Sequence, residues 1–153
     1  MNLTKNALTL VATLLVALPF AARGEEGSDG PNQGRVVVRC LHTLGHVTGR
    51  HARKTAKVTR RSVFVINQLQ QDGEDEAAAT VAENAESAVG RIGEHAAARI
   101  QEVVDNCSAI LQEIGADPQA FAMLEQGAAR ATEKLQEVAA TSLQKIEDAL
   151  ATP

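Results

Sequence analysis

The chain has 153 residues, with 15 Lys and Arg against 19 Asp and Glu, and a formal net charge of −4. Aromatic residues make up 2% of it, while 44% of the residues are hydrophobic and many of those are alanine. Such a small amount of bulky material excludes a deep globular pocket or a broad sheet core, and favours one small domain of long helices with thin apolar seams.

Residues 1–24 have the pattern of a secretory signal peptide. Lys5 precedes the uncharged run Ala7–Phe20, and small residues occupy positions −3 and −1 before Glu25. The run is shorter than the roughly 20 apolar residues of a membrane span, and Pro19 interrupts it. We therefore expect cleavage before Glu25, with an uncleaved anchor as the alternative. The mature chain would lie in the periplasm or outside the cell, where disulfides persist.

Residues 25–34, with the sequence EEGSDGPNQG, combine turn formers and charges with nothing to bury. This composition predicts a disordered leader. From residue 35 onward, apolar residues recur at spacings of three and four, and no proline occurs before Pro118. Helix is therefore the only periodicity that this stretch supports.

Two breaks divide the helical stretch into three. Residues 71–76 (QDGEDE) end one helix and place acidic residues in the first turn of the next. Residues 115–118 (GADP) supply a glycine after a helix, an aspartate N-cap and a proline at the first position of another helix. We predict an all-α domain over residues 35–151, an elongated antiparallel three-helix bundle similar to a coiled coil. Its helices cover residues 35–71, 75–114 and 118–151.

The two cysteines predict how the first two helices align. Cys40 lies 33 residues before Gly73, Cys107 lies 34 residues after it, and both fall on apolar faces. In a hairpin that turns at Gly73 they share one height, within the Cα separation of about 4.4–6.8 Å that a disulfide needs. We predict an intrachain disulfide, with two buried thiols or a bond between chains as the alternatives. The same alignment brings His51 level with His95.

Basic residues are concentrated in the first helix. Residues 31–71 hold eight Lys and Arg and no Asp or Glu, whereas residues 72–153 hold sixteen acidic and five basic residues. At about 100° per residue, the basic side chains of the first helix share one face. The anion-binding candidates on this face are Arg35, Arg39, Arg50, Arg53, Lys57 and Arg60, accompanied by His42, His46, Lys54 and Arg61.

This basic face has two interpretations. It can point outward and bind a polyanion, such as acidic polysaccharide, or an anionic membrane surface. Nucleic acid is not an expected partner, because Phe64 is the only aromatic side chain that the first helix offers for base stacking and an exported chain rarely meets nucleic acid. The favoured interpretation is that the face complements acidic neighbours inside the bundle. The pairs predicted on that interpretation are Arg53 with Glu94, His42 with Asp105, and Arg60 or Arg61 with Glu86.

No motif predicts catalysis or a metal centre. His42 and His46, four residues apart, form only a weak zinc candidate with Asp105, because neighbouring arginines oppose a dication and no HExxH motif occurs. Gly90 and Gly93 lack the lysine and the preceding strand of a phosphate loop, and we expect them to admit a neighbouring helix or to bend their own. We expect no cofactor and no enzymatic activity.

The sequence therefore predicts a secreted or periplasmic helical bundle that acts by surface contact. The first functional hypothesis is a structural or protein-interaction module that binds another helix or itself. The alternative is a binding module for anionic polymer or a membrane surface, acting through the basic face of the first helix.

Overall fold

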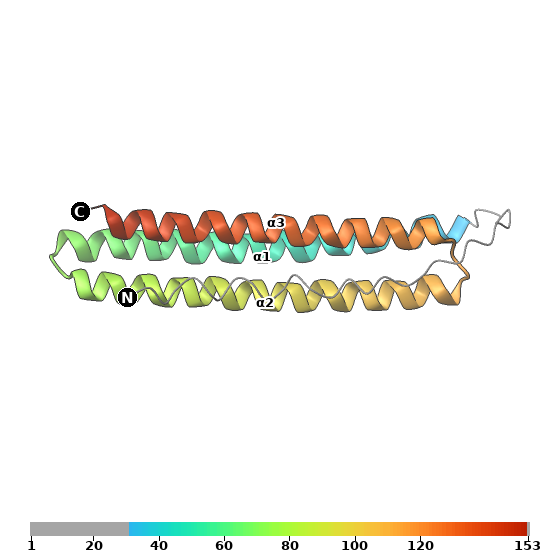
Figure 1. Ribbon diagram of the computed structural model, residues 1–153, viewed down its shortest axis with the longest axis horizontal. Coiled ribbons are helices and arrows are strands. Elements are labelled where there is room, and N and C mark those ends of the chain that lie inside the picture. The colour runs from blue at the N-terminus through green and yellow to red at the C-terminus, as the bar shows by residue number, and fades with distance from the viewer. Residues whose placement is uncertain (1–30, 153) are drawn as a thin grey trace, which may run out of the picture.

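The computed structural model describes residues 31–152. Three helices fill this part of the chain, α1 (Pro31–Gln71), α2 (Asp75–Glu113) and α3 (Pro118–Ala151), and no strand occurs within it. They run up, down and up along one long axis, so that the C-terminus lies beside the α1/α2 turn (Figure 1). Each helix packs against both others. The fold is thus the all-α three-helix bundle that the sequence predicts, while the predicted signal peptide and residues 25–30 lie outside the described residues.

Both breaks between helices have the local chemistry that the sequence predicts. Gly73 ends α1 with a φ of +76°, and Gly115 follows α2 with a φ of +66°, a left-handed conformation that glycine adopts without strain. The Asp117 side chain caps α3 by accepting a hydrogen bond from the Ala120 N–H at 2.9 Å, and Pro118 occupies the first turn. Two short turns of this kind force the three helices to lie antiparallel in sequence order.

The first helix begins four residues earlier than predicted, inside the segment expected to be a disordered leader. Its first turn carries Gln33, whose Nε2 donates to Asp117 Oδ2 at 2.7 Å, and the Asp117 N–H donates back to Gln33 Oε1 at 3.1 Å. The Gln33 amide, followed by the Ala120 N–H, holds the pKa of the Asp117 carboxyl below its ordinary value. This pair ties the start of α1 to the α2/α3 turn, a contact across 84 residues that local composition does not reveal.

Buried side chains recur every 11 residues. Eleven residues over three turns give 3.67 residues per turn, close to the 3.6 of a straight helix, so each apolar seam keeps to one face without the left-handed winding of a heptad coiled coil. We did not expect this period from the spacings of three and four alone. The buried series are Leu44, Thr55 and Ile66 in α1; Ala78, Val89, Ile100 and Leu111, with Ala85, Ala96 and Cys107, in α2; and Ala120, Ala131 and Ser142 in α3.

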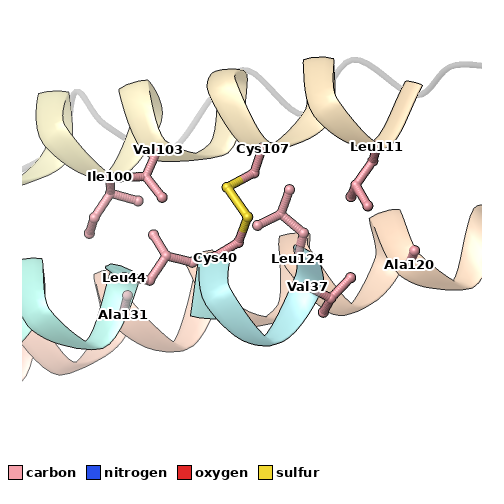
Figure 2. Packing of buried hydrophobic residues seen from close by; sticks show 10 residues of the cluster. All are labelled: Val37, Cys40, Leu44, Ile100, Val103, Cys107, Leu111, Ala120, Leu124 and Ala131. Carbon is pink, nitrogen blue, oxygen red and sulfur yellow. A yellow bond between two sulfur atoms is a disulfide. The ribbon is translucent and has the colours of Figure 1, made fainter. Parts of the chain in front are cut away.

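The structure pairs Cys40 with Cys107 in a disulfide, with a Cα separation of 6.2 Å. The bond links α1 to α2 inside the apolar cluster near the α2/α3 turn, and Leu124 of α3 lies beside it (Figure 2). The hairpin of α1 and α2 is therefore closed at both ends, by the Gly73 turn at one and by the disulfide at the other. Its alignment is the one that the cysteine positions predict.

A polar layer separates this cluster from a second one near the α1/α2 turn. The second cluster is centred on Ile66, Val89 and Ile146. Between the clusters, buried polar side chains replace large apolar ones. Thr59 Oγ1 donates to the Thr55 carbonyl oxygen of its own helix at 2.9 Å, so this hydroxyl is satisfied without a partner on another helix. The buried polar side chains are His51, Thr55 and Thr59 of α1 and Ser142 of α3.

Gly90 and Gly93 do not admit a neighbouring helix, which was the first of the two roles expected of them. A Cβ atom added at either position would meet no atom within 4 Å, and neither residue has a positive φ. The close approach occurs instead at Gly127 of α3, where an added Cβ would collide with the Leu41 side chain of α1.

We therefore expect Gly90→Ala to raise the free energy of unfolding by about 0.8 kcal/mol, because alanine restrains the unfolded chain and fits the helix. Urea denaturation followed by circular dichroism measures the change. Gly73→Ala is the matched control and should lower stability by roughly 1 kcal/mol, because its φ is left-handed. A loss of stability in Gly90→Ala would contradict the open space found there.

Candidate functional site

The candidate site is the outward side of α1, here called the basic face. All of its members are exposed to solvent. At the roughly 98° per residue of an 11-residue repeat, most of them lie about 130–165° around the helix from Leu44, Thr55 and Ile66, and Lys54 lies about 100° from those residues. Each of the anion-binding candidates predicted from the sequence is therefore on the surface, and the structure brings them together on one side of one helix. The basic face consists of Arg35, Arg39, His42, His46, Arg50, Arg53, Lys54, Lys57, Arg60 and Arg61.

The basic face repeats with the same 11-residue period as the core. Arg39, Arg50 and Arg61 are 11 residues apart, and so are Arg35, His46 and Lys57. Eleven residues span about 16.5 Å of helix, so the charges form three groups along roughly 40 Å. Because both patterns share one period, the cations stay on the outward side of α1 from Arg35 to Arg61.

The internal charge pairs that the sequence favoured do not form. Within residues 31–152 the two ion pairs are Arg99 with Glu102 and Lys134 with Glu137, each inside a single helix. Asp105, predicted beside His42, instead accepts a hydrogen bond from Gln101 at 2.8 Å. Most of the basic face points away from α2 and α3, Arg60 borders α3, and no member of the face forms an ion pair with the described part of the bundle.

Two apolar side chains lie among the cations. Val38 and Phe64 are 65% and 63% exposed, near the two ends of the basic face. Gly34, Arg35, Val38, Arg39 and His42 line a shallow depression at the end near the disulfide. An apolar contact is thus available at each end of the basic face, with charge between them.

The histidines of this face have no third metal ligand. His42 and His46 are exposed and pack edge to face with ring centroids 4.4 Å apart. Among the described residues, no group of three His, Cys, Asp or Glu side chains lies close enough to hold a metal ion. The structure therefore brings the two rings into contact with each other on the basic face.

His51 and His95 meet across the α1/α2 interface, as the cysteine alignment predicts. His51 is buried, and its Nδ1 must donate to the Val47 carbonyl oxygen, 2.8 Å away, because that oxygen can only accept. In the neutral ring, Nε2 of His51 is then free to accept a hydrogen bond from the Nδ1–H of His95, 3.2 Å away. Both ring nitrogens of the buried His51 therefore have hydrogen-bond partners.

A second feature, an open groove between α1 and α3, was not predicted. It has a volume of about 860 Å³ and lies toward the α1/α2 turn. Arg60 of α1 and Lys134 and Lys145 of α3 line it together with Glu137 and Asp148. The sequence carried no signal for it, because apolar spacing does not reveal which flank of one helix faces which flank of another.

Searches with this chain match no protein-family model, no curated protein and no solved structure. None of the helices in the described part is long and apolar enough to cross a membrane. The disulfide is typical of an oxidising compartment outside the cytoplasm. Inference about function therefore depends on the chemistry of the exposed faces.

Proposed function

We propose that this protein is an exported, non-catalytic module that binds a linear anionic polymer, such as an acidic polysaccharide, through the basic face of α1. The observation that carries the proposal is that this face is exposed along its whole length and forms no ion pair with the rest of the bundle. An extended row of uncompensated cations raises the local concentration of polyanions and releases their counterions on binding.

A polymer fits this face better than a membrane does. The cations follow a straight line about 40 Å long, which a chain of repeating anionic units can track. Apolar side chains that could enter a lipid layer are few, since Val38 and Phe64 are the large ones exposed within the face. The predicted signal peptide and the disulfide support a periplasmic or extracellular location, where acidic polysaccharides are available partners.

Retention of the oxidised protein on immobilised heparin, with salt-dependent elution, tests the proposal. A cation beside an anionic surface contributes about 1 kcal/mol, so Arg50→Ala/Arg53→Ala/Lys57→Ala should weaken binding by roughly a hundredfold. The matched control removes three cations elsewhere, in Arg91→Ala/Arg130→Ala/Lys145→Ala, and should retain most of the affinity. Equal losses in the two variants, or stronger binding to anionic vesicles than to the polymer, would overturn the proposal.

A further inference from the structure

The acidic residues of α2 repeat with the same period as the basic residues of α1. Glu83, Glu94 and Asp105 are 11 residues apart and exposed, and we call them the acidic series. They lie about 100° around α2 from His95 and about 160° from Cys107, the two residues that contact α1. The acidic series is therefore turned away from α1, on the exposed side of α2.

Acidic groups are also crowded where α2 meets α3. Burial raises the pKa of the Glu86 carboxyl, and the charges of Glu147 on α3 and Glu83 raise it further. Neither the acidic series nor Glu147 takes part in the two ion pairs of the described chain. The rod thus carries uncompensated negative charge on the α2/α3 side and uncompensated positive charge on α1.

The two charged faces also match in position along the rod. The disulfide pairs residue 40 with residue 107, so residue 50 of α1 is level with about residue 97 of α2. Each arginine of the series Arg39, Arg50 and Arg61 is displaced along the rod from one acidic residue of α2 by about three residues, or roughly 4.5 Å. The pairs are Arg39 with Asp105, Arg50 with Glu94, and Arg61 with Glu83. Two rods lying side by side can therefore bring three charge pairs together at once with a shift of less than one helical turn.

We propose that copies of this chain associate side by side, with the basic face of one copy against the acidic series of the next. Acidic and basic residues of these two helices thus pair between chains, with partners other than those the sequence favoured within one chain. Because the two faces lie on different sides of the rod, the contact is heterologous. A pair of copies therefore still exposes one basic face and one acidic series, to which further copies can bind. The association is open-ended and weakened by salt. It is independent of polymer binding, although a polymer and a second copy compete for the same face.

A charge-swap experiment tests this association. Analytical ultracentrifugation of the oxidised full-length mature chain should give a mass that rises with concentration at about 0.02 M salt and returns to the monomer at about 0.5 M. Arg39→Glu/Arg50→Glu/Arg61→Glu and Glu83→Arg/Glu94→Arg/Asp105→Arg should each remain monomeric when alone at low salt. An equimolar mixture of the two should associate, because every contact again joins opposite charges. A monomeric parent chain at low salt, or a mixture that stays monomeric, would overturn the proposal.

Two further measurements keep folding and polymer binding separate from this result. Circular dichroism checks that each variant is helical. The second measurement is carbodiimide coupling of the parent chain, with isotopically light and heavy copies mixed. It should join Lys54 or Lys57 of one copy to Glu94 of another. Absence of mixed-isotope products would count against the contact even if a variant failed to fold. The variant with the reversed acidic series keeps its basic face, so loss of self-association with heparin retention that is not weakened separates this inference from the proposed function.

Discussion

Reduction of the Cys40–Cys107 disulfide should lower the free energy of unfolding by about 4 kcal/mol, the largest effect that we expect from any single bond in this molecule. The two residues are 67 positions apart, so the bond removes much of the freedom of the unfolded chain. A small domain with an Ala-rich core has only a modest free energy of unfolding, so a loss of this size is a large part of it. Denaturant titration of the same chain with and without reductant measures the loss.

The same experiment has an internal control. Cys40→Ala/Cys107→Ala should have the stability of the reduced parent, lowered a little further by the missing sulfur atoms, and should not respond to reductant. If the oxidised and reduced parent unfold at the same denaturant concentration, the bond does not constrain the unfolded chain in the way that the loop-closure argument requires.

The alignment of the bundle could be predicted from particular residues of the sequence. The near-equal distances from Gly73 to Cys40 and Cys107 fixed which residues of α1 and α2 share a height, and the contact of His51 with His95 agrees with that alignment. The glycine, aspartate and proline of residues 115–118 fixed the second turn, because each satisfies a need of a helix end. Local chemistry of this kind determines helix ends and heights.

The direction of the basic face was predicted wrongly, although the sequence contained the signal. Arg39, Arg50 and Arg61 repeat with the same 11-residue period as Cys40, His51 and Ser62 of the apolar seam. Each arginine precedes its seam residue by one position, and it therefore lies about 100° from that residue around the helix. The opposite net charges of neighbouring helices favoured internal pairing instead. The 11-residue period keeps the cations opposite the core, and burial of the seam, which is worth more than exposed ion pairs, decides the orientation.

Other features could not be found from spacing. Gln33 reaches Asp117 across 84 residues, and its contact depends on the complete bundle. The groove between α1 and α3 likewise depends on the order of the helices around the bundle axis, which the apolar pattern leaves open. The apolar pattern of a single helix therefore does not predict contacts that depend on the arrangement of all three helices.

Ile146→Ala should lower the free energy of unfolding by about 2–4 kcal/mol, and the loss should be concentrated in the last turns of α3. Ile146 is fully buried in the cluster near the α1/α2 turn. The disulfide joins α1 to α2 and does not hold this end of α3, and the open groove leaves one flank of α3 without close packing. Gln70 Nε2 donates to the Leu150 carbonyl oxygen at 2.9 Å, an exposed contact that adds little.

Hydrogen exchange measured by mass spectrometry separates local from global opening. In Ile146→Ala, amides of residues 142–152 should exchange faster than in the parent, while those of α1 and α2 stay protected, because the closed hairpin retains its turn and its disulfide. Leu124→Ala is the matched control in the same helix, and its buried side chain packs in the cluster that holds the disulfide. There the lost contacts belong to all three helices, so exchange should rise along the whole chain. Uniform acceleration in Ile146→Ala as well would mean that the end of α3 opens only when the entire bundle does.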